Sequence, residues 1–448
     1  MRTEFVRSRQ VLSVTFATLA AASGFVAGPS RAQGVCPIDV EVVALRDCQL
    51  PNGDGLVDLD GISQPGAATL NALIAAVEVD PLLDALSKAI QALESDIDIA
   101  RAAEQLAPIV NFATPQAALA LNSAIGGRID SRLQDVGDLT GTSDLPGPFG
   151  LGMKQALAAP SYLGAGSNTK GFVTPQREAV WGEAFGAFLD QDRRDLVDGY
   201  DADLYGVLTG YDNLVAPNAR IGIAIGYGNT SIDGKGVTSG SSTDIDSYLV
   251  EAYGAVKGPG WYVSGRTGFA WHSFDTVRFV DVPVVDRADG DYDGWQFNAA
   301  AEAGAPIRTN GLIVTPFASL TYSHLDQDAY TETGGVVALA IEDQKTESLV
   351  SGLGVKALAP LSKTAAIEGR AVWLHEFEDV SQTVTASFAA GGGTFTAAGP
   401  AVGRDTAGLG FRFLGQINEA AVFELNYDAN LRQDFVAHIA SARLVVGF

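Results

Sequence analysis

The chain has 448 residues, of which 47% are hydrophobic and 18% charged, with 51 glycines, two cysteines and a formal net charge of −24. At roughly 100–200 residues per domain, this length suggests two or three domains, or one large domain with an appendage. The apolar content excludes a disordered chain, the two cysteines exclude a disulfide-framework miniprotein, and the acidic balance argues against a nucleic-acid binder.

Residues 1–32 have the features of a secretory signal peptide. Three arginines within the first nine residues precede a weakly apolar stretch over 11–28, and Ser30-Arg31-Ala32 resembles a cleavage site. A transmembrane anchor is the alternative, because a stretch of about 18 residues lies near the lower limit for a spanning helix. We expect export by the general secretory translocon and cleavage before Gln33. No second apolar run of that length follows, so helical spans are not expected in the mature chain.

Residues 33–136 are rich in alanine and leucine and show helical periodicity. Apolar side chains recur at three- and four-residue spacings over 71–77 and 81–93, which is typical of amphipathic helices. The pattern therefore predicts a small helical region ahead of the second half of the chain.

A third helix is expected over 115–133. Thr114 is its candidate N-cap, and Pro115 would occupy the first helical position. The Gly126-Gly127 pair lowers the helix propensity in the middle of this segment. Glycine, proline, serine and threonine then dominate residues 137–175, which indicates a linker.

Two features near the start of this region suggest further chemistry. Residues 52–61 (NGDGLVDLDG) resemble part of a calcium loop, but the anchoring carboxylates at its two ends are missing, so a solvated turn is favoured over a metal site. Cys36 and Cys48 enter the oxidising periplasm, where a small-loop disulfide is expected and two unpaired thiols are the alternative.

From Gln176 onward the hydrophobic pattern changes to alternation of period two. All but six of the 38 aromatic residues follow Gly171. Each alternating run is about ten residues long, which is the length that a tilted strand needs to cross a bilayer. Twelve such segments lie at residues 179–188, 203–211, 219–228, 245–256, 260–271, 293–304, 312–322, 346–359, 366–376, 405–413, 419–428 and 436–448.

The connections between these segments alternate in length. Short connections with turn signals lie near 212–218, 257–259, 305–311, 360–365 and 414–418, whereas long polar ones lie near 189–202, 229–244, 272–292, 323–345 and 377–404; the last, near 429–435, is short. Tight turns on one side and long loops on the other are typical of an outer-membrane barrel. An even strand count also returns both barrel ends to the periplasmic side.

A soluble β-sandwich is the alternative, since its strands also alternate. Two observations favour the barrel. Small residues recur on the polar face, at Gly222, Gly226, Gly268, Gly352 and Gly354, and aromatic residues gather near segment ends as in interfacial girdles, at Trp181, Tyr211, Trp261, Trp271, Trp295, Tyr322 and Trp373. We therefore predict an all-β transmembrane barrel of 12 antiparallel strands over 176–448, closed because a free edge is costly in lipid, and preceded by a small, mainly α-helical region.

Ionisable residues on these strands should point into the lumen, where water or opposite charges solvate them. The lumen-facing candidates are Arg266, Glu302, Lys356, Glu368, Arg370, Arg412, Glu424 and Arg443. One interpretation is a hydrated passage that accommodates an extended chain and a plugging helix. The other is that mixed-sign side chains simply fill and rigidify the interior.

Catalytic motifs are not found in the sequence. It contains no G-x-S-x-G elbow, no H-E-x-x-H helix and no P-loop. His375 next to acidic residues would suit a surface hydrolase, but a solvated surface is the favoured interpretation. We predict that the protein is not an enzyme and uses no cofactor.

Residues 176–448 resemble the translocator domain of autotransporters, the twelve-stranded barrel of type V secretion. The resemblance runs in consistent order through VWGEAFGAF (180–188), DADLYGVLTGYD (201–212), ARIGIAIGYGNTSID (219–233) and GWYVSGRTGFAWHSFDTVR (260–278). It implies a Gram-negative outer membrane with its lipid and lipopolysaccharide, periplasmic chaperones, and insertion by the barrel-assembly machinery. The signal read by that machinery would comprise Phe448, Val446, Leu444 and Ala442.

The segment 102–133 is similar to the helix that precedes the barrel in this family, which implies a helix or an extended chain in the lumen after secretion. Typical passengers are long, repeat-rich β-helices, whereas residues 33–100 are short, helical and without repeats. We expect an autotransporter barrel that anchors and translocates or displays its own N-terminal region. The alternatives are a surface adhesin or structural protein anchored by the barrel, and a plugged porin-like barrel.

Overall fold

The computed structural model describes residues 61–138 and 178–448, without 310, 363, 379–380 and 419. The signal peptide, the two cysteines, the calcium-like turn up to residue 60 and most of the linker lie outside the described residues. The expectations for those segments therefore stay predictions.

Four α-helices precede the barrel in the described part of the chain: α1 (Gln64–Ala76), α2 (Pro81–Gln91), α3 (Asp96–Leu106) and α4 (Val110–Asp138). The first three begin at a capping side chain, since Ser63, Asp80 and Ser95 each accept a hydrogen bond from a backbone N–H of the first turn. The periodicity of the sequence predicts α1 and α2 but not α3. The buried face of α3 also includes the polar residues Glu104 and Gln105.

The longest helix, α4, begins at Val110 rather than at Pro115, so the predicted helix start is wrong. Thr114 lies inside the helix, where its hydroxyl donates to the Val110 carbonyl at 3.0 Å. Val110 and Phe112 are buried, and the packing of this first turn outweighs the start signal of the proline. The Gly126-Gly127 pair does not interrupt the helix. No helix in the described part of the chain is long and apolar enough to cross a membrane.

Twelve long antiparallel strands form a closed barrel in the order β6-β5-β4-β3-β2-β1-β18-β17-β16-β13-β12-β8, and β8 pairs back to β6. Their bounds are β1 (Glu178–Gln191), β2 (Tyr200–Ala216), β3 (Ala219–Gly234), β4 (Ser242–Gly258), β5 (Trp261–Val280), β6 (Asp286–Gly304), β8 (Leu312–Gln327), β12 (Gln344–Pro360), β13 (Ala365–Glu376), β16 (Asp405–Gln416), β17 (Ala421–Arg432) and β18 (Phe435–Gly447). The short β7 (Ile307–Thr309) pairs with β8, and β10 (Thr333–Gly334) pairs with β6. Each predicted segment coincides with one long strand, and the predicted fold class is confirmed.

The barrel closes where the first strand pairs with the last. Ala179 of β1 lies opposite Gly447 of β18, and the Phe448 N–H donates to the Glu178 carbonyl at 3.1 Å. The side chains of Ala442, Leu444, Val446 and Phe448 alternate outward and are exposed on the barrel surface. Because each of the twelve long strands described pairs with a strand on both sides, these strands leave no long unpaired edge facing lipid.

Outward-facing aromatic side chains form a row across neighbouring strands. Tyr227, Tyr248, Trp271 and Trp295 lie opposite one another on β3 to β6, and all four are exposed. Such a row is typical of an interfacial girdle. Trp181 does not belong to it, contrary to the prediction, because its position on β1 points inward and leaves it only 1% exposed.

The two ends of the barrel differ. At one end, which we call the turn end, tight turns such as that between β2 and β3 join the strands; the other end, the loop end, carries the longer connections. These connections are shorter than predicted, because β5 and β6 stay paired up to Val280 opposite Asp286, within the predicted loop 272–292. Beyond the apolar part of the barrel, outward-facing strand positions need not be apolar. Asp275 of β5 and Asp291 of β6 lie opposite each other there, and both are exposed.

A small sheet and a 3₁₀ turn add to the loop end. The sheet has the order β15-β14-β11-β9 and comprises β9 (Tyr330–Thr331), β11 (Leu339–Ile341), β14 (Thr383–Phe388) and β15 (Phe395–Ala398), and the turn is η2 (Gly236–Thr238). Helix α1 packs against β15, and α3 packs against β5 and η2. The first three helices therefore sit at the loop end.

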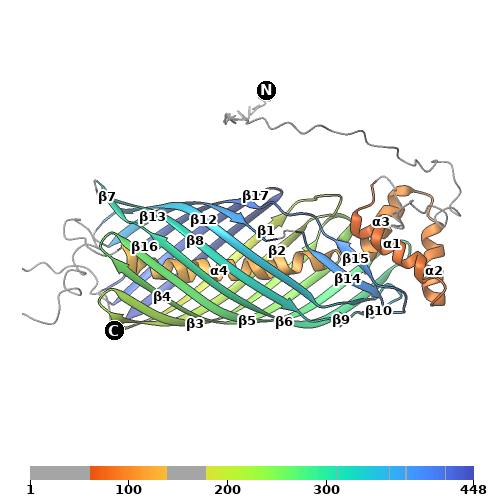
Figure 1. Ribbon diagram of the computed structural model, residues 1–448, viewed down its shortest axis with the longest axis horizontal. Helices are drawn as coiled ribbons and strands as arrows, with labels where there is room; N and C mark the ends of the chain where they lie inside the picture. Colours follow the sequence, from red (N-terminus) through yellow and green to blue (C-terminus); the bar gives the residue numbers. More distant parts are fainter. Residues whose placement is uncertain (1–60, 139–177, 310, 363, 379–380, 419) are drawn as a thin grey trace, which may run out of the picture. The chain divides into compact units, whose positions relative to one another are not determined.

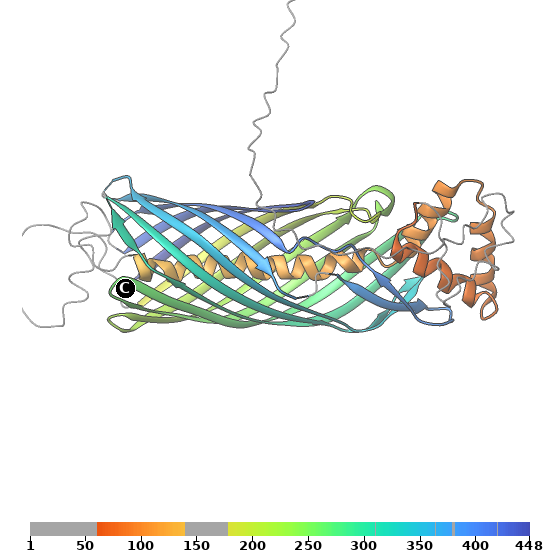
Figure 2. The ribbon, with the colours of Figure 1, turned by 45° about the horizontal axis from the view of Figure 1, so that its top comes forward.

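Helix α4 runs through the barrel (Figures 1 and 2). It packs mainly against β3, β4 and β5. Its buried residues Leu121, Ile125 and Ile129 share one apolar cluster with Ala224 of β3 and Leu249 of β4. The lumen therefore holds part of the apolar core, with the helix seated against one side of the barrel wall.

Candidate functional site in the barrel lumen

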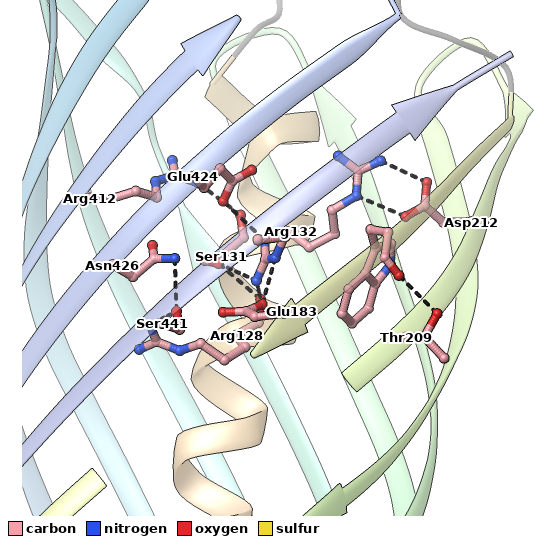
Figure 3. A network of polar contacts seen from close by, with 12 residues as sticks. Arg128, Ser131, Arg132, Glu183, Thr209, Asp212, Arg412, Glu424, Asn426 and Ser441 are labelled. Carbon is pink, nitrogen blue, oxygen red and sulfur yellow. Dashed lines mark hydrogen bonds and ion pairs between the residues drawn. The ribbon is translucent and has the colours of Figure 1, made fainter. Parts of the chain in front are cut away.

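The last turns of α4 bring Arg128, Asp130, Ser131 and Arg132 into the lumen near the turn end. Figure 3 shows these turns beside β1, β2, β17 and β18. A buried charge without a partner is costly in a protein interior. Each of these four residues makes a polar contact with a strand of the barrel.

Arg443 of β18 lies at the centre of this network. Its Nε donates to Glu183 Oε2 of β1 at 2.7 Å, and its Nη1 donates to Glu424 Oε2 of β17 at 3.2 Å. Its Nη2 donates to the Ser131 hydroxyl at 2.9 Å and to the Arg128 carbonyl. One buried guanidinium therefore joins the last strand to the first strand, to β17 and to the helix.

Arg128 of α4 binds a carboxylate on the strand next to the seam. It forms an ion pair with Asp428 of β17 and donates to the Ser441 hydroxyl at 3.0 Å. Asp428 also accepts a hydrogen bond from Arg370 of β13 at 2.9 Å. This carboxylate therefore lies between two guanidinium groups.

Arg132, one turn further along α4, binds Asp212 of β2 through two hydrogen bonds. Its Nε and Nη2 donate to the two carboxylate oxygens at 2.9 and 3.0 Å. Asp212 is fully buried, also pairs with Arg220, and accepts from the Tyr253 hydroxyl at 3.2 Å. A two-point arginine–carboxylate contact fixes orientation as well as distance, so it sets the rotation of the helix.

Arg266 of β5 occupies the space beside Gly126 of α4. Its guanidinium donates to Glu251 at 3.3 Å and to Asn298 at 3.1 Å, and its Nε lies 3.5 Å from Asp130 of the helix. A Cβ added at Gly126 would lie within 2.0 Å of this guanidinium. The missing side chain of Gly126 therefore provides the room that the arginine needs.

Two further ion pairs lie on the inner wall. Lys356 of β12 and Glu302 of β6 are 2.6 Å apart, and the Tyr262 hydroxyl donates to the same carboxylate at 2.6 Å. Arg412 of β16 lies 3.3 Å from Glu368 of β13 and donates to the Ser131 carbonyl of α4 at 3.0 Å.

The structure places all eight predicted lumen residues on the inner wall of the barrel. Seven are buried and Arg370 is half-buried. Arg266, Arg412 and Arg443 contact α4 directly, whereas Arg370 and Glu424 reach it through a shared partner. Lys356, Glu302 and Glu368 pair with other wall residues. Their functional role stays a prediction.

Sequence reasoning found Glu424 and Glu368, the acidic partners of Arg443 and Arg412, but missed Glu183 and Asp212. Glu183 shares the inward face of β1 with large apolar residues such as Trp181 and Phe185, so polarity alone does not mark that face. Asp212 falls in a predicted turn, whereas β2 continues to Ala216. The arginines of α4 did carry a signal, because Arg128 and Arg132 are the two basic residues of this helix and are spaced four residues apart.

At the loop end, polar contacts hold α3 against the barrel. Gln105 donates to the Val237 carbonyl and to Asp281, both at 2.8 Å. Arg278 of β5 donates to the Leu106 carbonyl at 3.1 Å. Helix α3 is thereby attached to the rim from which α4 enters the lumen.

One acidic side chain in this helical part is buried. The Glu104 carboxylate of α3 accepts a hydrogen bond from the Ser63 hydroxyl at the start of α1. Burial raises the pKa of Glu104 to about 7, although the Ser63 hydrogen bond lowers it. The contact between α1 and α3 therefore depends on a carboxyl group that titrates near neutral pH.

These contacts are suited to holding a helix inside a barrel. Arginines of the helix bind acids of the wall near the turn end, and an arginine of the wall fits against a helix glycine. In the described part of the chain, no group of three or more histidine, cysteine, aspartate or glutamate residues is arranged to hold a metal ion.

A closed antiparallel barrel with outward apolar side chains and a helix of its own chain in the lumen has the architecture of a transmembrane β-barrel. The family model of the Autotransporter beta-domain matches residues 180–428, more than half of the chain, and the chain belongs to this family. The barrel is accordingly an outer-membrane barrel of a Gram-negative bacterium, of the kind that works with the barrel-assembly machinery.

Two curated relatives and one solved structure illustrate the similarity. The chain is 26% identical over 287 residues to the extracellular serine protease of Serratia marcescens, covering 63% of this chain and 27% of that protein. It is 30% identical over 224 residues to outer membrane protein B of Rickettsia typhi, covering 46% of this chain and 13% of that protein. The chain thus spans about a quarter or less of these relatives.

The fold is also similar to the translocator domain of the autotransporter NalP from Neisseria meningitidis. The TM-score is 0.52 at 14% identity, and the match covers 62% of this chain and 90% of that domain. At this identity the similarity concerns the fold alone.

Proposed function

We propose that the barrel exports the region preceding α4 to the cell surface and afterwards keeps α4 in its lumen as a plug. The observation that carries this proposal is the direction of the chain. Near its N-terminal end, α4 contacts the loop end, where Asn111 donates to the Tyr330 hydroxyl at 2.9 Å. Near its C-terminal end, Arg132 binds Asp212 beside the β2–β3 turn. Because β1 also starts at the turn end, residues ahead of α4 must cross the barrel to reach the loop end.

The contacts described above support a retained helix rather than a transient one. Buried ion pairs join α4 to β2 and β17, and a partly buried pair joins it to β5. Breaking a buried pair typically costs about 3–5 kcal/mol. Helices α1 to α3 then form a short segment displayed at the surface. In this proposal the general secretory translocon and periplasmic chaperones deliver the chain, Phe448 and its outward neighbours on β18 guide assembly, and the exposed strand faces contact lipid and lipopolysaccharide.

We also propose that the barrel domain itself is not an enzyme. Its buried acids and bases are engaged in ion pairs that hold the helix and the wall, which supports a structural use of these groups. The Serratia relative is named as an extracellular serine protease, but the matched part makes up only 27% of that protein.

An epitope accessibility experiment tests the export proposal. A short epitope inserted between α2 and α3, at residues 92–95, should bind antibody on intact cells. The same epitope in the β4–β5 turn at 258–260, which lies at the turn end, should bind only after the outer membrane is permeabilised. An epitope at 92–95 that stays hidden on intact cells would overturn the proposal.

A further inference from the structure

The lumen is not filled evenly, because α4 is seated against β3, β4 and β5. Between the helix and the opposite wall lies a cavity of about 310 Å³, within the range of roughly 300–1,000 Å³ that is usual for binding sites of small molecules. Near the loop end its lining includes Gln116 of α4 together with Gln382, Arg404 and Arg432. Arg404 is exposed, so this part of the cavity can be reached from the loop end.

Hydroxyl groups without a protein partner face this cavity. Ser319 and Thr321 of β8 and Thr406 of β16 line it from inward-facing, half-buried strand positions. Their side chains make no hydrogen bond to another residue of the described part of the chain. Val372 and Leu374 of β13 add apolar surface to the same wall. Free hydroxyl groups beside apolar surface are suited to a small molecule that itself carries several hydroxyl groups.

Two guanidinium groups at the loop-end part of the cavity bind only neutral oxygens. Arg404 donates to the Phe377 carbonyl at 3.0 Å, and Arg432 donates to the side-chain oxygen of Gln116 at 3.1 Å. Among the residues that the structure describes, neither arginine forms an ion pair, and the buried Nε of Arg432 has no hydrogen-bond partner. Because a buried donor without a partner is costly, an anionic oxygen of a ligand would be favoured beside Arg432.

Glu376 of β13 also lines this part of the cavity, but its carboxylate is engaged with the wall. It accepts hydrogen bonds from the N–H groups of Leu349 and Glu378 at 2.8 and 3.1 Å, and from the Ser348 hydroxyl at 2.5 Å. The two guanidinium groups and this carboxylate together carry one net positive charge. The loop-end part of the cavity therefore favours an anion over a neutral ligand.

We propose that the loop-end part of this cavity is a binding site for a small anionic sugar, of which a sugar phosphate is the example. Arg404 and Arg432 bind the anionic group, since guanidinium donors match the oxygens of phosphate and carboxylate. The free hydroxyl groups of the wall bind the hydroxyl groups of the sugar. This site goes beyond export of the N-terminal region, and binding of the sugar does not depend on that export.

Calorimetric titration of the purified full chain in detergent with glucose 6-phosphate tests the site. We expect saturable binding of one ligand per chain. Arg432→Gln should weaken it by roughly tenfold or more, because the variant removes the charge and the free Nε donor. Arg287→Gln, which changes an exposed and outward-facing arginine, is the matched control and should bind as the wild type does. Migration of the unboiled protein on gels shows that each variant is folded.

Two further ligands separate the contributions of charge and hydroxyl groups. Glucose lacks the anionic group and inorganic phosphate lacks the sugar, so each should bind several-fold more weakly than glucose 6-phosphate. Inorganic phosphate that binds equally tightly would overturn the assignment to a sugar. No saturable binding of glucose 6-phosphate, or equal weakening by Arg432→Gln and Arg287→Gln, would overturn the site itself.

A second measurement locates the bound sugar and leaves both arginines in place. In a chain whose two native cysteines are replaced by serine, Thr321→Cys places a thiol on the cavity wall, and Asp291→Cys places one on the exposed outer face of β6. Saturating glucose 6-phosphate should slow the reaction of the Thr321→Cys thiol with iodoacetamide several-fold and leave that of the Asp291→Cys thiol unchanged. An unchanged rate at Thr321→Cys, or equal slowing of both thiols, would overturn the placement of the site in the cavity.

Discussion

Arg443 of the last strand lies directly opposite Glu183 of the first strand, and their side chains form an ion pair of 2.7 Å across the barrel seam. Both side chains are completely inaccessible to solvent. The same guanidinium donates to the Ser131 hydroxyl of α4. Closure of the barrel and seating of the helix therefore share one side chain.

We expect Glu183→Gln to lower the stability of the folded barrel markedly. The variant leaves a buried guanidinium with one carboxylate fewer, and breaking a buried ion pair costs about 3–5 kcal/mol. The measurement is the temperature at which the fast-migrating folded form converts to the unfolded form on gels. Asp190→Asn, which removes the exposed pair with Lys235, is the control and should cost less than about 1 kcal/mol. Equal losses in the two variants would contradict the role of the seam pair.

The adjacent glycines of α4 should respond in opposite ways to alanine. Gly126→Ala forces the Arg266 guanidinium away from Glu251 and Asn298, and should destabilise the seated helix by about 1–3 kcal/mol. Gly127→Ala meets open space and should stabilise it by roughly 0.5–1 kcal/mol, because alanine is the better helix former. Hydrogen exchange of the α4 amides measures both effects. A loss of protection in both variants would show that helix packing around Gly127 is tighter than described.

The stability of the α1–α3 contact should fall as the pH rises. The Glu104 pKa of about 7 in the folded protein lies above the ordinary value of 4.5, so folding favours the neutral carboxyl. Its contribution is fully present below pH 4.5 and is lost as the pH rises through 7, with a total of roughly 3 kcal/mol.

Protection factors of the α1 and α3 amides, corrected for intrinsic exchange, should therefore be higher at pH 5 than at pH 8. Glu104→Gln should remove this pH dependence and keep the protection high at pH 8. Glu94→Gln, at an exposed position between α2 and α3, is the matched control. Protection that does not change with pH in the wild type would refute the assignment.

The outward side chain of Phe448 should matter for assembly more than for stability. Phe448→Ser is expected to reduce the amount of folded barrel in the outer membrane, whereas Phe411→Ser removes a similarly exposed phenylalanine from the middle of β16 and should reduce it less. The measurement is the yield of heat-modifiable barrel in isolated outer membranes. An equal reduction would indicate a general loss of lipid contact rather than a terminal signal.

Most of the barrel is predictable from the sequence because strand alternation is a local property. Ile221, Ile223 and Ile225 are all exposed on the outer face, as their alternation with Arg220 indicates. Trp181 shows where this reasoning fails. An aromatic near a strand end suits either the girdle or the lumen, and only the register of the neighbouring strands decides which.

The site is less predictable because its pairs join residues far apart in the chain. The candidate arginines can be found from strand parity, but the choice of partners depends on how α4 is placed. Arg132 and Asp212, for example, lie 80 positions apart and meet only when the helix occupies the lumen. The start of α4 was missed for the same reason, since burial of Val110 against the barrel extends the helix beyond its local signal.

The central claim is that α4 stays inside the barrel after the region ahead of it has reached the loop end. Disulfide trapping on intact cells tests it most directly, in a chain whose two native cysteines are replaced by serine. Asn122 of α4 and Ser323 of β8 are in contact, with Nδ2 and Oγ 3.2 Å apart. On mild oxidation the pair Asn122→Cys with Ser323→Cys should be trapped in most of the barrels in the outer membrane. Asn122→Cys with Leu320→Cys, which points outward on the same strand, should not be trapped. Trapping of neither pair, or of both equally, would contradict the account.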